Sequence, residues 1–203
     1  LCINNPEVDF ENTFNDLEKF NKTIAVYPEI IKKSKDHDLF SNLELQYDKY
    51  FNAGVMFINF EKWAKEVSVD KLLEFVEIYK EKIIFWDQDI LNKYFDGNYV
   101  EIKNILNFSV KSSIPVNSFI DNAKLIHYAG NHKPWTIEAG CEESSTIFFN
   151  LYQELNLGYY FFTKKNRLTK TLISIISDII SLKVFRTKYP MKYIKEAIKT
   201  MIS

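Results

Sequence analysis

Residues 124–135, Lys-Leu-Ile-His-Tyr-Ala-Gly-Asn-His-Lys-Pro-Trp, combine side chains that could bind a metal ion and a phosphate. The apolar pair at 125–126 leads directly into His127, which is typical of a buried strand that ends in a turn. A neutral imidazole can ligate a metal, a glycine lets backbone approach a bulky anion, and a lysine supplies a positive charge for phosphate. Because open α/β sheets bind ligands at the carboxyl ends of their strands, His127, Gly130 and Lys133 form a candidate site. The alternative is an ordinary turn in which His127 bonds a backbone carbonyl.

Residues 50–59, Tyr-Phe-Asn-Ala-Gly-Val-Met-Phe-Ile-Asn, form a second stretch that could contact a ligand. The apolar run over 55–60, interrupted only at position 59, predicts a strand buried on both faces. Small or amide residues stand just before it, where backbone could approach a ligand closely: Asn52, Ala53 and Gly54. Asn52 could also be only a turn residue, because asparagine favours turns in its own right.

Residues 85–92, Phe-Trp-Asp-Gln-Asp-Ile-Leu-Asn, place two carboxylates and an amide at the start of a predicted short helix. Helix capping and the helix dipole would explain Asp87 or Asp89 alone. They would not explain Trp-Asp-Gln-Asp as a set. Asp87 and Gln88 are therefore candidates for contact with a substrate.

Strands and helices alternate between these stretches. Strands are predicted at 23–27 (stopped by Pro28), 99–102 and 125–127, helices at 12–21, 61–83 and 145–155, a surface helix and loop over 32–46, and a loop-rich crossing over 103–123. Apolar residues at three-to-four spacing indicate that the helix over 61–83 packs against the domain and has no chemical role. Asp36-His37-Asp38 matches the spelling of a metal-binding Asp-x-Asp motif, but no apolar strand precedes it, so we predict a solvated loop there.

Length and composition indicate one sizeable globular domain, or one domain with an appendage, in a chain of 203 residues. Two cysteines, Cys2 and Cys141, provide no disulfide framework and no metal-ligand spacing, which fits a reducing compartment. The sequence shows no secretory signal and no apolar run of about eighteen residues. We therefore expect a cytoplasmic protein.

The net charge of −1 hides a strong asymmetry. From residue 161 to 203 there are ten Lys and Arg against two acidic residues, a net +8, so residues 1–160 carry −9. Leu168, Leu172, Ile175, Ile176 and Ile179 are predicted to share one face of a helix in this basic segment. A basic amphipathic helix flanked by aromatic residues suits an anionic bilayer surface. The alternative is a helical hairpin packed on the domain with solvated lysines.

Three motifs in a fixed order resemble the second half of a family 8 glycosyltransferase, the group that includes bacterial lipopolysaccharide galactosyl- and glucosyltransferases and glycogenin. They are Phe-Asn-Ala-Gly-Val-x-x-Ile-Asn at 51–59, Asp-Gln-Asp-Ile-Leu-Asn at 87–92 and His-Tyr-x-Gly-x-x-Lys-Pro-Trp at 127–135. The resemblance covers about residues 47–137. It implies a GT-A fold, an α/β domain around a mostly parallel sheet, occupying 1–157 as a partial domain, with a basic helical extension over 158–203.

The resemblance also implies a role for each matching residue. His127 would ligate the metal, Gly130 and Lys133 would hold the donor diphosphate, and Gln88 would stand on the reacting face of the anomeric carbon. Asp87 would hydrogen-bond sugar hydroxyls and share the catalytic position with Gln88. The group lining the donor sugar would be Asn52, Ala53 and Gly54, and the acceptor pocket would include Phe85 and Ala129.

The reaction implied by the resemblance moves a hexose, glucose or galactose, from a UDP-sugar to a hydroxyl with retention of configuration, helped by Mn²⁺ or Mg²⁺. The departing UDP develops charge on its β-phosphate, which a divalent ion and a fixed ammonium can neutralise. Gln88 is a neutral amide and a poor nucleophile. A front-face displacement is therefore favoured over a covalent glycosyl-enzyme, although the sequence leaves both open.

One departure from the family concerns the metal site. The family's Asp-x-Asp lies about fifty residues ahead of Phe-Asn-Ala-Gly, which falls here near Cys2-Ile3-Asn4, where no carboxylate pair stands. Hard cations require several oxygen ligands, so His127 alone would hold Mn²⁺ poorly. We therefore expect an acceptor-side portion that lacks the N-terminal UDP-binding part, either a fragment or a degenerate member.

Three functions fit the sequence. The first is half of a hexosyltransferase that builds lipopolysaccharide or another surface glycan on a saccharide or lipid-linked saccharide acceptor, peripheral on the inner face of the membrane through 158–203. The second is a non-catalytic, membrane-associated module with a degenerate glycosyltransferase fold. The third, a self-glycosylating enzyme, fits least because the tail is membrane-like. No nucleic-acid partner is expected.

Overall fold

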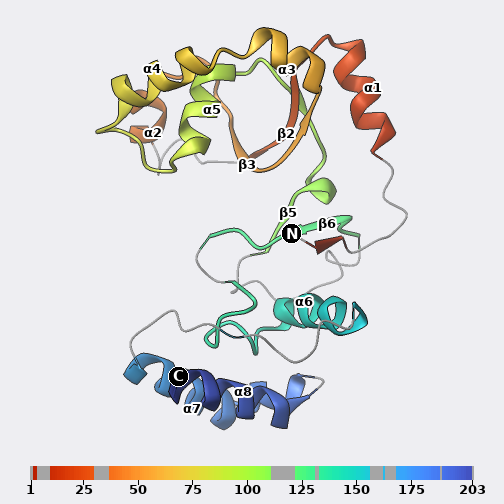
Figure 1. The fold of residues 1–203 in the computed structure, drawn as a ribbon, viewed down its shortest axis with the longest axis vertical. Coiled ribbons are helices and arrows are strands. Elements are labelled where there is room, and N and C mark those ends of the chain that lie inside the picture. The colour runs from red at the N-terminus through yellow and green to blue at the C-terminus, as the bar shows by residue number, and fades with distance from the viewer. Residues whose placement is uncertain are drawn as a thin grey trace. The chain divides into compact units, whose positions relative to one another are not determined.

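The computed structural model describes residues 2–3, 10–29, 37–110, 122–130, 133–155, 162, 168–187 and 189–202. The chain divides into two compact units: Glu7–Asn107, called here the 7–107 unit, and Leu1–Pro6 with Phe108–Ser203, called the 108–203 unit. Each unit mixes helices with a small sheet (Figure 1). The predicted α/β class is therefore confirmed, whereas the predicted boundary after residue 157 stays a prediction.

The sheet of the 7–107 unit is flanked by helices. Its elements are α1 (Glu11–Lys19), β2 (Ile24–Glu29), α2 (His37–Asn42), β3 (Tyr50–Ile58), α3 (Phe60–Glu66), α4 (Val69–Tyr79), α5 (Asp87–Phe95), β4 (Val100–Glu101) and η1 (Asn104–Leu106). The strand order is β3-β2-β4, with β2 antiparallel to β3 and parallel to β4. Ile24 and Val26 of β2 are buried with Phe51 of β3 and Phe95 of α5, so packing of apolar side chains joins α5 to the sheet.

Several local predictions for this unit need correction. β2 runs through Pro28 instead of stopping there, with a register shift between Val26 and Pro28, because proline cannot donate to a strand ladder. β3 begins at Tyr50, five residues before the predicted strand, and its later part alternates buried and more exposed residues instead of burying both faces. His37 and Asp38 begin α2 rather than lying in a loop, and Asp36 lies outside the described residues.

The predicted single helix over 61–83 is two helices, α3 and α4. Asn59 caps α3 by accepting a hydrogen bond from the Lys62 amide (3.1 Å), and Ser68 caps α4 by accepting one from the Lys71 amide (3.2 Å). Val67 is extended between them, because Ser68 starts a new helix. Tyr79 is the only α4 residue that is buried, so α4 packs against the domain less completely than its spacing predicts.

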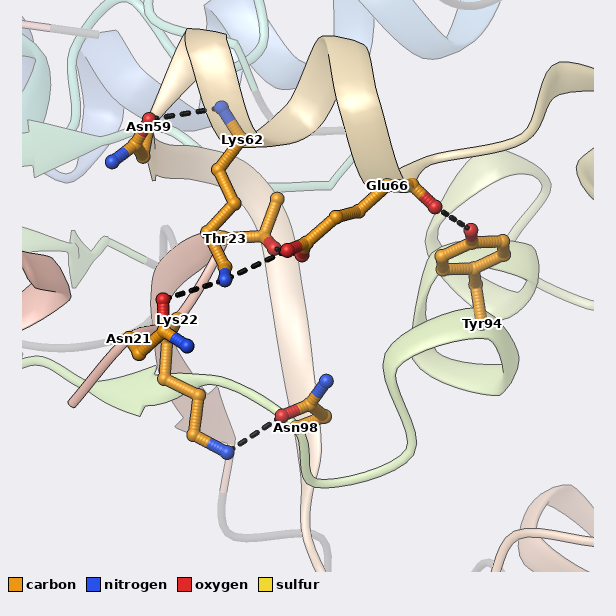
Figure 2. Close-up of polar contacts among 8 residues, drawn as sticks. All are labelled: Asn21, Lys22, Thr23, Asn59, Lys62, Glu66, Tyr94 and Asn98. Atoms are coloured by element: carbon orange, nitrogen blue, oxygen red, sulfur yellow. Dashed lines mark hydrogen bonds and ion pairs between the residues drawn. The ribbon is translucent and has the colours of Figure 1, made fainter.

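A polar cluster on α3 ties the helix to its neighbours (Figure 2). Lys62 bonds the Asn21 side chain (2.7 Å) and forms an ion pair with Glu66 (2.7 Å). The Thr23 hydroxyl donates to Glu66 (2.9 Å), and the Tyr94 hydroxyl of α5 donates to the Glu66 carbonyl (2.8 Å). Lys62, followed by the Thr23 hydroxyl, lowers the pKa of the Glu66 carboxyl. Side chains from α3, α5 and the start of β2 therefore meet at Glu66.

In its described residues, the 108–203 unit combines three short strands with three long helices. Its elements are β1 (Cys2–Ile3), β5 (Phe108–Ser109), β6 (Leu125–His127), α6 (Glu143–Glu154), α7 (Leu168–Ile180), η2 (Lys183–Arg186) and α8 (Pro190–Ile202). The strand order is β1-β6-β5, with β6 antiparallel to β1 and parallel to β5. The predicted strand at 125–127 is confirmed. Both described sheets are mixed, whereas the resemblance implied a mostly parallel one.

The main core of this unit joins the turn after β6 to the helices. Ile137 and Cys141 are buried with Phe149 of α6, Ile175 of α7 and Tyr193 of α8. The Tyr193 hydroxyl donates to the Ile137 carbonyl (3.0 Å), and burial raises the pKa of the Cys141 thiol to about 12.

Within the described residues, no helix is both long enough and apolar enough to cross a membrane.

Asp178 is a buried carboxylate on the inward side of α7. Its Oδ1 lies 4.0 Å from Lys183 Nζ, and its Oδ2 makes no hydrogen bond to the residues that the structure describes. Burial raises the pKa of Asp178 to about 6, although Lys183 acts in the opposite direction. The folded state therefore binds this proton more tightly than the unfolded state does.

We expect Asp178 to make the protein less stable as the pH rises. A raised carboxyl pKa contributes stability fully below the ordinary value of 3.8, and this contribution is lost as the pH rises through about 6. Asp178→Asn should unfold at a higher urea concentration than the parent at pH 8, with a smaller difference at pH 4. Urea unfolding followed by circular dichroism measures this. The exposed Glu154→Gln variant is the charge-matched control, and equal midpoints for D178N and the parent at pH 8 would contradict the assignment.

Candidate active site

The start of α5 is held in place by a buried carboxylate, Asp89. It is fully buried and accepts hydrogen bonds from the backbone amides of Ile84 (2.6 Å) and Phe85 (2.8 Å) and from the Tyr50 hydroxyl of β3. Burial, followed by the bond to Asp89, raises the pKa of Tyr50, so this hydroxyl keeps its proton. Three donors thus satisfy Asp89, which fixes the loop that leads into α5.

Asn92 joins α5 to β3 one turn later. Its side chain accepts a hydrogen bond from the Phe51 amide (2.8 Å) and donates one to the Phe51 carbonyl (2.9 Å). A neighbouring strand would make the same two bonds with its backbone. It also donates to the Gln88 carbonyl (2.8 Å). Sequence analysis passed over Asp89, Asn92 and Tyr50 as site residues. The sequence did contain a signal for Asp89 and Asn92. They stand three positions apart, so they share the side of the helix that faces the strand.

Gln88 reaches back to β3 through its side chain. Its Oε1 accepts a hydrogen bond from the Ala53 backbone amide (3.1 Å). With Oε1 held there, the carboxamide has a fixed anchor on the strand, and its NH₂ group remains a donor. Ala53 and Gln88, which stand thirty-five positions apart in two different motifs, therefore meet at this contact.

Asn52 is tied to both β2 and β3. Its Nδ2 donates to Glu29 Oε1 (3.0 Å), and its Oδ1 accepts from the Gly54 amide (2.9 Å). Asn52 is thus part of a strand and not a separate turn. Glu29 was missed by sequence analysis, because nothing in residues 23–29 indicates that β2 continues beyond Pro28 to carry this carboxylate.

The residues just before and at the start of α5 are exposed. Asp87 is exposed, and Phe85 packs against Tyr50 with ring centroids 6.4 Å apart while remaining half exposed. Trp86 adopts φ 54° and ψ −121°, a conformation rare for a residue with a side chain, and is 81% exposed. The 7–107 unit thus groups Asn52, Ala53, Gln88 and the exposed Asp87 around the end of one helix.

His127 ends β6 and begins the turn in the 108–203 unit. Its carbonyl accepts from the amides of Val110 (3.0 Å) and Ala129 (2.9 Å), so its backbone position is fixed by both β5 and the turn. Burial, followed by the positive charge of Lys133, lowers the pKa of His127. The imidazole is therefore neutral at pH 7, the form that ligates metals.

The turn after His127 places Gly130 and Lys133. Gly130 has φ +70°, which favours glycine, and a Cβ there would meet nothing within 4 Å. Lys133 Nζ donates to the Tyr128 carbonyl (2.6 Å), and the Tyr128 hydroxyl donates to the Ser144 carbonyl (2.7 Å). The ammonium is therefore fixed to the turn that carries His127. Residues 131–132 lie outside the described residues.

The described part of the chain does not assemble a complete metal site. It contains no group of three or more His, Cys, Asp or Glu side chains placed to hold a metal ion. β1 lies beside β6, with Cys2 paired to Ile126, so the position counted for the family's Asp-x-Asp borders the strand that ends in His127. One imidazole does not satisfy a hard divalent cation.

The mixed sheets and the helices around them define an α/β protein, and comparison with known proteins gives the family. The model of glycosyl transferase family 8 matches residues 9–139, more than half of the 203 residues, and the chain belongs to this family. A crystal structure of the galactosyltransferase LgtC with donor and acceptor sugar analogues matches with a TM-score of 0.55 and 22% identity, over 66% of this chain and 52% of that one. This likeness shows the GT-A fold.

Curated relatives share part of their length with this chain. A lipopolysaccharide 1,2-glucosyltransferase of Escherichia coli is 36% identical over 114 residues, 51% of this chain and 33% of the relative. General stress protein A of Bacillus subtilis (strain 168) is 29% identical over 101 residues, 43% of this chain and 35% of the relative. The chain thus spans about a third of the length of these relatives.

We expect Asp89→Asn to destabilise the protein, because the asparagine NH₂ would face one of the groups that now donate to the carboxylate. A lost charge-assisted bond and an unsatisfied buried donor cost about 2–4 kcal/mol. Tyr50→Phe removes one hydroxyl and should cost about 1 kcal/mol. Urea unfolding of both variants tests the order of the two effects. The exposed Asp87→Asn is the matched control and should stay within about 0.5 kcal/mol of the parent. A D89N variant as stable as D87N would contradict the anchoring role.

Proposed function

We propose that the chain is part of a retaining hexosyltransferase that moves glucose or galactose from a UDP-sugar to a saccharide acceptor of lipopolysaccharide or another surface glycan. The observation that carries the proposal is the contact between Gln88 and the Ala53 amide, which brings the second motif onto the first beside the exposed Asp87. Family membership supports the reaction class, and the lipopolysaccharide glucosyltransferase relative supports the substrate class.

In the 7–107 unit, the proposed ligand is the donor sugar. Asp87 is exposed and would accept hydrogen bonds from sugar hydroxyls, while Asn52, Ala53 and Gly54 would line the sugar from β3. Gln88, anchored through its Oε1, would present its NH₂ group to the reacting face of the anomeric carbon. Phe85, packed on Tyr50 and half exposed, would line an acceptor pocket. Ala129, the other residue that the resemblance assigns to the acceptor, belongs to the 108–203 unit.

In the 108–203 unit, the proposed ligand is the donor diphosphate. The ammonium of Lys133 would attract the phosphate oxygens, and the open space beside Gly130 would admit them close to backbone. His127, neutral at pH 7, would be one ligand of Mn²⁺ or Mg²⁺.

The proposed displacement keeps all reacting groups on one face of the sugar. The bond between the anomeric carbon and the β-phosphate oxygen breaks, the acceptor oxygen forms the new bond, and the acceptor proton passes to the departing phosphate. The NH₂ group of Gln88 would donate a hydrogen bond to an oxygen of the donor or the acceptor and so orient the reacting groups. A nucleophilic role is not assigned to Gln88, because a neutral amide is a poor nucleophile. Lys133 stabilises the phosphate that leaves.

The proposed acceptor is a saccharide or a lipid-linked saccharide, and the proposed location is the inner face of the membrane, contacted through 158–203. The net charge of +8 over residues 161–203 supports contact with anionic lipid.

A second candidate function is a non-catalytic, membrane-associated module. No carboxylate pair stands at Cys2-Ile3-Asn4, so His127 is the one metal ligand proposed among the described residues. This favours the non-catalytic module.

Calorimetric titration of UDP into the 203-residue chain, with and without Mn²⁺, tests the donor site. Wherever UDP binds, with or without added upstream sequence, Lys133→Met should weaken it at least about tenfold, because an ammonium on phosphate contributes about 1.5–3 kcal/mol. Lys124→Met, which removes a nearby lysine outside the proposed phosphate site, is the control and should bind like the parent.

A second titration separates the sugar from the nucleotide. Asp87→Asn should weaken UDP-glucose or UDP-galactose and leave UDP unchanged, because its proposed partner is a sugar hydroxyl. If UDP binds only after upstream sequence is added to the chain, this result would support the proposal that the chain is part of an active transferase. No UDP binding under either condition would refute the transferase proposal and leave the non-catalytic module.

A further inference from the structure

Trp86 differs from the other two tryptophans of the chain because its indole lies in solvent. The ring of Trp63 packs against Phe95, with centroids 5.8 Å apart. The ring of Trp135 packs against Phe148, with centroids 5.5 Å apart. Trp86 is 81% exposed, and no ring contact to it is found within the described residues. An exposed indole is unfavourable in water and indicates a surface that binds something.

The backbone of Trp86 adopts a conformation that glycine favours. Its φ of 54° and ψ of −121° are those of the first central residue of a type II′ turn, a position normally occupied by glycine. The Gln88 amide closes this turn by donating to the Phe85 carbonyl (3.1 Å). A side chain in this region strains the backbone. Trp86 therefore combines an exposed ring with a strained backbone, and neither stabilises the fold.

Contacts on both sides of Trp86 hold the strained residue in place. Before it, the amides of Ile84 (2.6 Å) and Phe85 (2.8 Å) donate to the buried Asp89. After it, the Gln88 side chain accepts a hydrogen bond from a backbone amide of β3 (3.1 Å). Strain persists only where the surrounding structure imposes it, and such positions are concentrated at ligand-binding sites. The position of the indole is therefore set by the same contacts that hold the candidate active site.

Apolar and polar groups lie side by side in the turn that carries Trp86. Ile84 and Phe85 are 52 and 49% exposed, so three consecutive apolar residues reach solvent, and the exposed Asp87 follows them. A pyranose ring has apolar C–H faces and hydroxyl groups at its rim. An aromatic ring can stack on such a face, and a carboxylate can accept hydrogen bonds from the rim. The turn therefore offers both kinds of contact that a saccharide requires.

Charge disfavours the other ligands that an exposed indole could bind. The 7–107 unit contains thirteen lysines against twenty acidic residues, a net −7, and Asp87 directly follows the indole. This negative charge repels an anionic lipid surface. A second copy of the chain would bring an equally acidic unit to the contact, which opposes pairing. A neutral saccharide is not repelled.

We propose that Trp86 binds the acceptor, with its indole stacked on the apolar face of a pyranose ring. The ring would extend the acceptor surface that Phe85 begins. The family resemblance implies roles for Phe85 and Asp87, on either side of Trp86, and none for Trp86 itself. The inference rests on the proposed function and adds to it a residue that selects the acceptor. Trp86 takes no part in making or breaking a bond.

Nuclear magnetic resonance of the isotope-labelled 203-residue chain tests the proposal, with lactose, maltose and methyl β-glucoside as probes. Each of the three tryptophans gives one indole N–H signal, so the signal of Trp86 is observed separately. We expect the probes to move this signal. Affinity is measured from the backbone amide signals of residues 84–88, which every variant retains.

Three substitutions separate stacking from general effects on the surface. Trp86→Ala should weaken saccharide binding at least about tenfold, because it removes the stacking ring. Trp86→Phe keeps an aromatic face and should stay within about threefold of the parent. Phe60→Ala is the matched control and should bind like the parent, because Phe60 is 76% exposed in the same unit and lies outside the candidate site.

Trp86→Gly separates the ring from the backbone strain. It removes the indole as Trp86→Ala does, but glycine adopts the positive φ without strain. W86G should therefore unfold at a higher urea concentration than W86A, while both lose saccharide binding equally. Urea unfolding followed by circular dichroism measures the difference and shows that both variants are folded. A W86G variant no more stable than W86A would contradict the strain on which the inference depends.

Three further outcomes would overturn the proposal. They are a Trp86 signal that none of the probes moves, equal saccharide binding by W86A and the parent, and a Trp86 signal that moves with protein concentration alone, which would assign the ring to a second copy. UDP titration of the same variants reports the donor site separately. UDP binding without a saccharide response would refute this inference alone, and a saccharide response without UDP binding would refute the transferase proposal alone.

Discussion

The candidate active site of the 7–107 unit depends on one buried carboxylate. Asp89 accepts the Tyr50 hydroxyl and two backbone amides, which fixes both the strand and the loop that precede α5. The Asn92 side chain bonds both the amide and the carbonyl of Phe51, as a neighbouring strand would, and Gln88 accepts a hydrogen bond from the Ala53 amide. A buried charge is tolerated only when hydrogen bonds satisfy it, so removing any of these donors changes the position of the proposed chemical groups.

Positioning and chemistry are divided between neighbouring residues of the same motif. The inward residues of 87–92 hold α5 against the strand, and the exposed Asp87 and the anchored Gln88 remain for a ligand. The turn after β6 shows the same division, because Tyr128 anchors the turn through Ser144 and Lys133 bonds the Tyr128 carbonyl. In both places a buried polar bond keeps a catalytic candidate in one orientation, which is how a protein prepares electrostatic stabilisation in advance.

Helix α7 buries polar side chains and exposes apolar ones. A carboxylate and a threonine are buried while isoleucines face outward, and burial of Asp178 raises its pKa to about 6. Helices normally bury their apolar side, and α7 departs from this pattern because Thr171 and Asp178 occupy two of its three buried positions.

The sequence by itself determined the family, the strand ending in His127 and the candidate residues in three motifs, because each motif is contiguous and its order is specific. Tertiary structure decided which contacts those residues make. Periodicity could not show that Ser68 starts a new helix, that Glu29 bonds Asn52, or that Asp89 faces inward while Asp87 faces outward, since each depends on contacts between segments distant in the chain. It also predicted one common face for the apolar residues of α7, but it could not show that Ile175 turns inward while Leu172 and Ile176 stay exposed.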